Sequence, residues 1–155
     1  AENVMITDLL RNDLGRFCEA GSVKVTELCG LYSFDNVHHL ISTITGQLAS
    51  GISAGNVMIA SSPGGSITGA PKKRAVEIIA ELEPHARGAY CGSLFAMTGN
   101  GWLQSSIAIR TLEAKGTSLY CWGGGGITAS SHWEAEYQET LDKIGPIMKG
   151  LEARH

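Results

Sequence analysis

The chain has 155 residues, of which 43% are hydrophobic and 17% are charged, which is enough to bury the core of one compact domain. Its net charge of -3 gives no basic surface for nucleic acid, and no apolar run reaches the roughly 20 residues that a membrane span requires. The four cysteines (Cys18, Cys29, Cys91 and Cys121) lack a C-x-x-C spacing and no secretory leader is visible, so we expect reduced thiols and a cytoplasmic protein.

The first third of the chain predicts one helix and two strands. Apolar residues recur at helical spacing over residues 2–14, and Gly15 is a typical helix stop. Residues 22–28 alternate as in a short strand, and the β-branched residues of 37–48 favour a second strand over a helix. In that strand His38 and His39 point to opposite faces, so at most one of them enters a given pocket. Taken alone, such a histidine is more often a hydrogen-bonded structural residue than a catalyst.

A glycine-rich loop lies between two predicted helices. Residues 54–61 predict a short helix, and residues 71–82 predict an amphipathic helix that begins at Pro71. The loop between them, 63–70, is not a phosphate-binding P-loop, because Gly69-Ala70-Pro71 stands where that motif needs Gly-Lys-[Ser/Thr]. A loop of this kind at the start of a helix still suits another anion, such as a carboxylate.

The next segments predict an antiparallel meander. Residues 89–98, 103–112 and 118–122 read as strands, joined by turns at 99–101 and 115–116. Together with the helices they predict an α+β fold, an antiparallel sheet covered by helices. Arg110 interrupts an apolar strand, so it is either paired in the core or directed at an anionic ligand, and arginine can hold a carboxylate by two parallel hydrogen bonds.

Four consecutive glycines, 123–126, precede the last predicted helix, 133–143. A run of this kind presents bare N–H groups to a ligand. On the helix, Glu136, Glu139 and Lys143 share one face. A solvated face with an ordinary ion pair is the simpler interpretation. Beside the glycines, however, these residues also offer oxygen ligands and a cation in one place.

Both ends of this last helix carry a prediction. Ser130 or Ser131 is expected to cap its first turn, since serine is a preferred N-cap residue. Gly145-Pro146 predicts a kink or a break just after Lys143, because proline removes a backbone donor and clashes with the preceding turn.

Five motifs together resemble the chorismate-utilising enzymes, in order and over nearly the whole chain. They are ITDLLRNDLGR (6–16), PGGSITGAPKKRAVEII (63–79), YCGS (90–93), SIAIRT (106–111) and EAEYQETLDK (134–143). The loop GGSITGAPK (64–72) favours the branch of this family that makes 4-amino-4-deoxychorismate for 4-aminobenzoate and folate synthesis. The resemblance implies that residues 1–155 are the C-terminal portion of one catalytic domain, truncated at its N-terminal side, as the start at Ala1-Glu2 without methionine also suggests.

The resemblance also implies a set of site residues. Glu2 and Glu139 would ligate Mg²⁺ directly and Glu136 through a bound water, while Lys143 would pair with Glu139 or with the ring carboxylate of the substrate. His39, rather than His38, would orient or protonate a group near the departing hydroxyl. Contacts to the substrate would come from Ser66 in the glycine-rich loop, and its enolpyruvyl carboxylate would be held by Tyr90, Arg110 and the N–H groups of Gly124, Gly125 and Gly126.

In this branch the 4-hydroxyl of chorismate is replaced by an amino group, with ammonia from a glutamine amidotransferase partner. The covalent lysine, in a Pro-Ile-Lys-Gly-Thr motif, and an acid/base glutamate lie upstream and are missing from these residues, so we expect the chain alone to be inactive. The family fold has four layers, α/β/β/α, and about half of it would expose sheet edges, with self-association or disorder near Glu2. The alternatives are anthranilate synthase component I, more distantly isochorismate or salicylate synthases, and a non-catalytic module that docks an amidotransferase.

Overall fold

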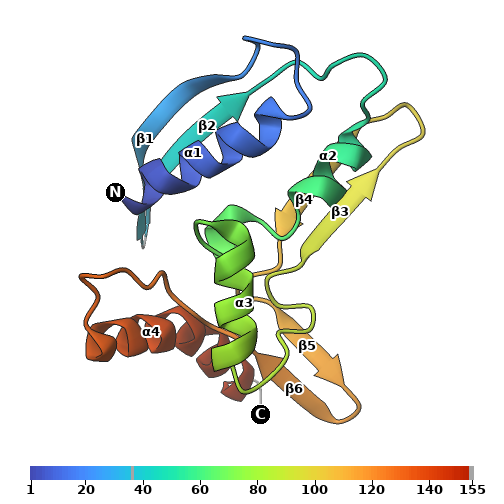
Figure 1. The fold of residues 1–155 in the computed structure, drawn as a ribbon. Helices are drawn as coiled ribbons and strands as arrows, with labels where there is room; N and C mark the ends of the chain where they lie inside the picture. Colours follow the sequence, from blue (N-terminus) through green and yellow to red (C-terminus); the bar gives the residue numbers. More distant parts are fainter. Residues whose placement is uncertain (36, 154–155) are drawn as a thin grey trace. The chain divides into compact units, whose positions relative to one another are not determined.

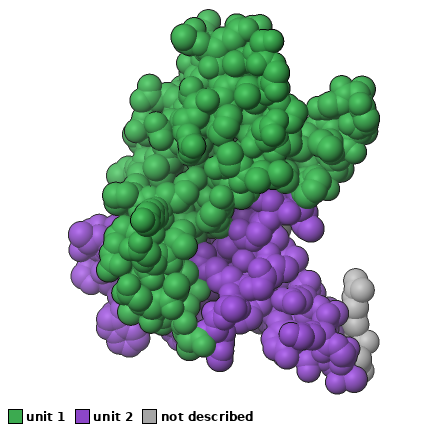
Figure 2. Space-filling model, turned by 45° about the vertical axis from the view of Figure 1, so that its right-hand side comes forward, with its two compact units in different colours: residues 1–84, 95–105 green, residues 85–94, 106–155 purple. Residues whose placement is uncertain are grey.

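The computed structural model describes residues 1–35 and 37–153, which divide into two compact units (Figure 2). Of the described residues, the first unit contains those within 1–84 and 95–105, and the second those within 85–94 and 106–153. Helices and antiparallel strands alternate along the chain, which confirms the predicted α+β class. That the whole chain forms one part of a single catalytic domain stays a prediction.

The first unit begins with a helix packed on a β-hairpin. Helix α1 (Glu2–Gly15) lies along strands β1 (Lys24–Phe34) and β2 (Val37–Thr45), as Figure 1 shows. The hairpin pairs Leu31 with Leu40 and Phe34 with Val37. Strand β1 is longer than the predicted 22–28, because it continues through a bulge at Cys29, whose φ of 53° is left-handed.

Two further helices of this unit match their predictions closely. Helix α2 (Ala54–Ser61) starts with a capping box, in which the Ser53 hydroxyl accepts from Asn56 N and the Asn56 side chain accepts from Ser53 N. The glycine-rich loop contains a short 3-10 turn, η1 (Gly65–Ile67), and leads into α3 (Lys72–Leu82). Lys72 Nζ lies 2.8 Å from Asp13 Oδ2 and also donates to Ser61 O, so the start of α3 is tied to the end of α1.

The predicted three-stranded meander is wrong, because the chain forms two separate hairpins. Strands β3 (Ser93–Met97) and β4 (Leu103–Ile107) pair with each other, as do β5 (Leu112–Lys115) and β6 (Ser118–Cys121). The predicted strand 103–112 is divided at Arg110, where φ is 50°. A left-handed residue breaks the extended backbone, so β4 and β5 cannot be one strand.

The last helix, α4 (Trp133–Glu152), belongs to the second unit and is longer than predicted. The expected break after Lys143 is wrong, because the helix runs through Pro146 to Glu152. Proline removes the hydrogen bond to the carbonyl of Asp142, and both residues are exposed, so water can satisfy that carbonyl.

The chain buries little of its apolar surface. Its accessible surface is 11215 Å², whereas a folded monomer of this mass exposes about 7,500 Å². Among the described residues only Thr7, Asp13, Gly65 and Ala108 are buried, and large apolar side chains of β1, β2 and β3, such as Leu31 and Leu94, are well exposed. We expect a further polypeptide segment or a second copy to cover these faces. No helix within residues 1–35 and 37–153 is long and apolar enough to cross a membrane.

Candidate functional site

The second unit contains a pocket beside the glycine run. Its volume is about 190 Å³. It is lined by the residues before β3, the turn between β4 and β5, the glycines after β6 and the middle of α4, namely Tyr90, Ile109, Arg110, Trp122, Gly123, Gly124, Lys143 and Ile144. Four residues that the sequence motifs single out, Tyr90, Arg110, Gly124 and Lys143, therefore meet in one hollow.

Arg110 enters this pocket from an unexpected backbone conformation. It is exposed at the turn between β4 and β5, so the alternative of a pair in the core is excluded. No described residue forms a hydrogen bond or an ion pair with its guanidinium group. A guanidinium with all its donors available, in the same pocket as the ammonium group of Lys143, favours an anion there.

The glycine run leaves no room for side chains where it passes Tyr90 and Ile144, and it also presents backbone amides. A Cβ atom on Gly124 would lie 2.8 Å from Tyr90 Oη, and one on Gly123 would lie 2.6 Å from Ile144 Cγ2. No described group accepts a hydrogen bond from the N–H groups of Gly124, Gly125 or Gly126. These amides are therefore available to a ligand oxygen.

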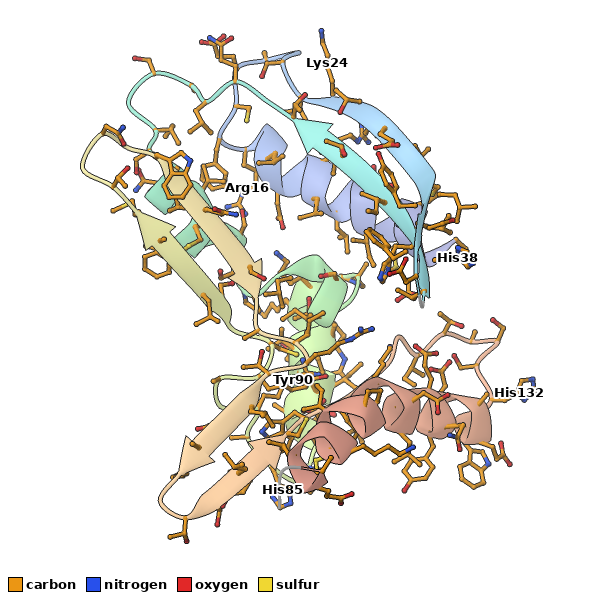
Figure 3. All side chains as sticks on the ribbon, turned by 180° about the vertical axis from the view of Figure 1, so that it is seen from behind. Arg16, Lys24, His38, His85, Tyr90 and His132 are labelled. Carbon is orange, nitrogen blue, oxygen red and sulfur yellow. The ribbon has the colours of Figure 1, made fainter. Side chains whose placement is uncertain are left out.

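Tyr90 is held in place by ring contacts. Its ring stacks on Trp122, with centroids 6.3 Å apart and an angle of 15° between the planes, and the Arg87 guanidinium lies 5.8 Å from the ring centroid. Figure 3 labels Tyr90 before β3 and His132 at the start of α4, where the His132 ring points away from the helix. The Tyr90 wall of the pocket is thus supported by the stacked ring of Trp122 and by the Arg87 guanidinium.

Two carboxylates and one ammonium group lie against the glycine run on the α4 side. A Cβ on Gly125 would lie 2.9 Å from Glu136 Oε2 and 3.9 Å from Glu139 Oε1. Lys143 Nζ lies 2.5 Å from Glu139 Oε1 and donates to Gly124 O at 3.1 Å. Lys143 therefore contacts the glycine segment directly, Glu136 lies close to it, and Glu139 is joined to it through Lys143.

Ser131 has a role that the sequence did not predict. The N-cap of α4 is His132, and no side chain caps the helix, so the predicted capping by Ser130 or Ser131 is wrong. Instead the Ser131 hydroxyl donates to Glu136 Oε1 at 2.5 Å and accepts from Thr128 N. The only hint of this hydrogen bond in the sequence was the spacing of five residues between Ser131 and Glu136. Its hydroxyl fixes one oxygen of Glu136 and leaves Oε2 directed at Gly125.

Three other predicted site residues belong to the first unit. Glu2 is exposed in the first turn of α1, and Ser66 is exposed in η1. His39 is exposed on β2, where its ring packs edge-on against Phe34 at 5.6 Å. His38, near the turn of the hairpin in Figure 3, instead hydrogen-bonds Ser33 Oγ at 2.9 Å. The described residues show no group of three or more His, Cys, Asp or Glu arranged for a metal, so the meeting of Glu2 with Glu136 and Glu139 stays a prediction.

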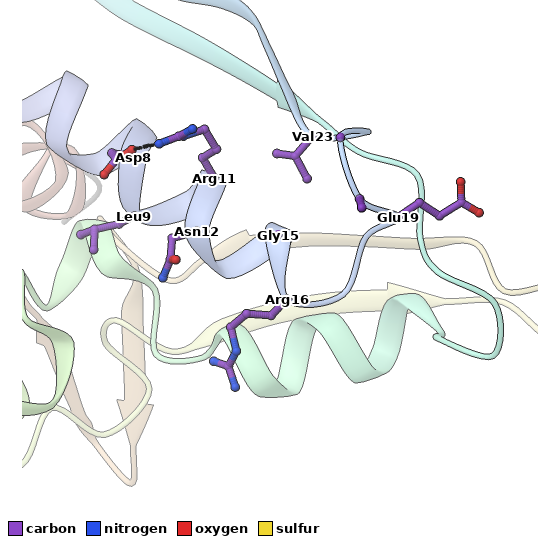
Figure 4. Close-up of a pocket in the computed structure, with 10 residues that line it drawn as sticks. Asp8, Leu9, Arg11, Asn12, Gly15, Arg16, Glu19 and Val23 are labelled. Carbon is purple, nitrogen blue, oxygen red and sulfur yellow. Dashed lines mark hydrogen bonds and ion pairs between the residues drawn. The ribbon is translucent and has the colours of Figure 1, made fainter.

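The first unit has a larger and more open hollow, shown in Figure 4. It lies at the end of α1 and contains Arg11 and Arg16 together with Asp8 and Glu19. Arg11 Nη2 already pairs with Asp8 Oδ1 at 2.6 Å, and both side chains are more than half exposed. Opposite charges balance in this hollow, and none of the predicted site residues lines it, so we place the candidate site in the second unit.

Comparison with known proteins decides the family. Residues 1–149 match the family model described as chorismate binding enzyme. The chain belongs to this family.

Two relatives and one solved structure illustrate the match to this chorismate-binding family. The chain is 56% identical over 152 residues to aminodeoxychorismate synthase component 1 of Escherichia coli (strain K12), covering 98% of the chain and 34% of that protein. It is 46% identical over 151 residues to anthranilate synthase component 1 of Pseudomonas aeruginosa, covering 97% of the chain and 31% of that protein. The crystal structure of anthranilate synthase component I from Streptococcus pneumoniae TIGR4 superposes with a TM-score of 0.85 at 39% identity, covering 91% of the chain and 32% of that structure. The chain thus spans about a third of the length of these relatives.

Proposed function

We propose that the chain is part of an aminodeoxychorismate synthase component 1, which replaces the 4-hydroxyl of chorismate with an amino group. The observation that carries this proposal is the pocket of the second unit, where Arg110, Tyr90 and Lys143 meet the glycine run. Support for the branch comes from the 56% identity to the Escherichia coli component 1. The site contributes part of the substrate-binding and metal-binding groups, and the rest belongs to the remainder of the enzyme.

In this proposal the pocket binds a carboxylate of chorismate. Arg110 offers two parallel N–H donors, and Gly124, Gly125 and Gly126 offer backbone N–H groups without partners among the described residues. Tyr90 Oη lies against Gly124 and adds a hydroxyl donor on the same side. Binding that combines a guanidinium group with fixed amides selects a planar anion over neutral ring compounds of similar size.

In this proposal the α4 carboxylates supply ligands for a magnesium ion. Glu136 Oε2 and Glu139 Oε1 both lie near the Cβ position of Gly125, so a small volume there is bordered by two hard oxygen ligands. Glu139 and Glu2 would bind the ion directly, and Glu136 would bind it through a water molecule. The bound ion would supply positive charge for the ring carboxylate. Lys143 keeps Glu139 turned towards Gly124 through its contacts with both residues.

His39 and Ser66 complete the proposed substrate contacts from the first unit. His39 would orient or protonate a group near the departing hydroxyl, and Ser66 would contact the substrate from the glycine-rich loop. Both side chains are exposed, as groups that meet a ligand must be before it binds.

We also propose the setting of the enzyme. A glutamine amidotransferase subunit would supply ammonia, the compartment would be the cytoplasm, and the chain alone would be inactive without the upstream lysine. The uncovered apolar faces of β1, β2 and β3 support self-association of the isolated chain. A module that only docks the amidotransferase would not need two acids and a lysine against a glycine run, which disfavours that alternative.

The product formed by the full-length protein tests the proposal. Chorismate and ammonia are supplied with Mg²⁺, and the products are separated by liquid chromatography, with Arg110→Gln as the inactive control. Aminodeoxychorismate is the expected product. Anthranilate would instead support the second candidate, which the 46% identity to the Pseudomonas aeruginosa anthranilate synthase keeps open. If neither product forms, the proposed reaction is wrong.

A further inference from the structure

The first turn of α1 is joined to the β1–β2 hairpin by one asparagine side chain. Asn3 Nδ2 donates to the carbonyl of Leu40 at 2.8 Å, across 37 residues of sequence. Asn3 Oδ1 accepts from Ser42 Oγ at 2.5 Å. The Asn3 side-chain amide therefore donates to and accepts from the same strand, β2. Two contacts from one side chain fix the position of the first turn of α1 along β2 and its rotation about the helix axis.

The partners of Asn3 are themselves held, so the contact belongs to a network. Ser42 Oγ also accepts from Cys29 N at 2.9 Å, at the bulge where β1 turns left-handed. Cys29 Sγ lies 3.4 Å from Asn3 Oδ1, and Thr7 Oγ1 donates to Asn3 O at 2.7 Å. Asn3, Cys29 and Ser42 are half-buried and Thr7 is buried, so water competes weakly for the hydrogen bonds among these four residues. The hydrogen bond from Asn3 to the exposed Leu40 is open to water.

The network lies between two residues of the proposed site. Glu2 directly precedes Asn3, and His39 directly precedes Leu40, whose carbonyl accepts the Asn3 hydrogen bond. Neither Glu2 nor His39 has a side-chain hydrogen bond among the described residues. The position of Glu2 is therefore set by its backbone, and that of His39 by its backbone and its ring contact with Phe34. Asn3 joins the two backbones.

We propose that Asn3 is a positioning residue that sets Glu2 and His39 relative to each other by joining the start of α1 to β2. The inference rests on the proposed function, because it assigns Asn3 to the same reaction. Asn3 does not touch the substrate in this scheme. It acts through its two neighbours, so its loss moves the proposed metal ligand and the proposed histidine together.

The test compares Asn3→Ala with Asn56→Ala in the full-length enzyme. Asn56 is also an asparagine of the first unit, and its removal breaks the capping box of α2 without touching the α1–β2 contact. Calorimetry measures the affinities for Mg²⁺ and chorismate, and kinetic assays measure kcat and KM separately. Asn3→Ala is expected to lower Mg²⁺ affinity and kcat by about 10-fold to 100-fold, with a smaller change in KM for chorismate. Asn56→Ala is expected to lower the melting temperature alone.

Two variants of Ser42 give a second measurement. Ser42→Thr keeps the hydroxyl and is expected to retain wild-type kcat, whereas Ser42→Ala is expected to lower kcat less than Asn3→Ala, because the hydrogen bond from Asn3 to Leu40 remains. The double variant is expected to add little to Asn3→Ala. Equal kcat and Mg²⁺ affinity in wild type and Asn3→Ala would overturn the inference. If the wild type itself does not bind chorismate, the proposed function fails instead. Hydrogen exchange at the Cys29 amide then still tests the contact, because unchanged protection in Asn3→Ala would show that Asn3 holds nothing in place.

Discussion

Replacing Gly125 with alanine is expected to disturb the carboxylates of α4 while leaving the fold intact. The added Cβ would lie 2.9 Å from Glu136 Oε2, which is closer than a carbon and an oxygen tolerate, and 3.9 Å from Glu139 Oε1. Gly125 does not have a positive φ, so alanine fits its backbone. The atom that must move is the end of a flexible side chain, so Glu136 rotates away and strains its hydrogen bond from Ser131.

The expected cost can be worked out from these contacts. A hydrogen bond to a carboxylate contributes about 1.5 to 3 kcal/mol, and alanine in place of glycine returns about 0.4 to 1 kcal/mol by restricting the unfolded chain. The free energy of unfolding should therefore fall by about 0.5 to 2.6 kcal/mol, and Mg²⁺ affinity should fall by about 10-fold or more because a carboxylate is displaced.

The assay for Gly125→Ala is calorimetry with Mg²⁺, together with thermal unfolding, on the full-length protein. Gly99→Ala is the matched control, because a Cβ at Gly99 would meet no atom within 4 Å and its φ is not positive. The control should bind Mg²⁺ as the wild type does. Wild-type Mg²⁺ affinity in Gly125→Ala would refute the reasoning that places the metal beside this glycine.

Three further substitutions test other contacts. Arg110→Lys keeps the charge but loses the two parallel donors, so chorismate affinity measured by calorimetry should fall by about 10-fold; equal affinity would show that only charge matters there. Lys72→Met leaves the buried Asp13 without its partner and should lower the free energy of unfolding in urea by about 3 kcal/mol, the low end for a buried pair, since the Lys72 side chain is partly exposed. No loss would mean that the ion pair does not hold α3 to α1. The hydrogen bond from Tyr32 to Glu27, and then the charge of Glu27, raise the pKa of Tyr32, so the pair contributes stability below the usual tyrosine pKa and loses it as pH rises through the raised value. Ultraviolet titration should show this pKa falling in Glu27→Gln, with Tyr32→Phe identifying the signal, and an unchanged titration would exclude the interaction.

The sequence predicted the helices best, because their signals are local. The apolar spacing of α1, the bounds of α2 and the start of α3 after Pro71 all follow from residues within one or two turns. The errors in the strands of the two hairpins occurred where single residues adopt left-handed backbone without being glycine. Cys29 and Arg110 both do so, and nothing in their side chains indicates it, so the bulge in β1 and the division between β4 and β5 were missed.

The part of the candidate site that follows from local spacing was predicted, and the part that depends on contacts between segments was not. The helical face with Glu139 and Lys143 follows from spacing alone, and the ion pair at 2.5 Å confirms that contact. The hydrogen bond between Ser131 and Glu136 could not be predicted, because the helix takes His132 as its N-cap and leaves the serine hydroxyl directed at the carboxylate. Nor does spacing predict that α4 continues through Pro146, since that depends on an exposed carbonyl that water can satisfy.

Calorimetric titration of chorismate into the full-length protein, with and without Mg²⁺, tests the binding site most directly when wild type is compared with Glu139→Gln. The glutamine keeps the size of the side chain but removes the negative charge that would hold the ion beside the glycine run. Wild type should bind chorismate more tightly with Mg²⁺, and Glu139→Gln should lose that difference. Undiminished Mg²⁺-dependent binding in Glu139→Gln would contradict a chorismate site built on α4 and the glycines.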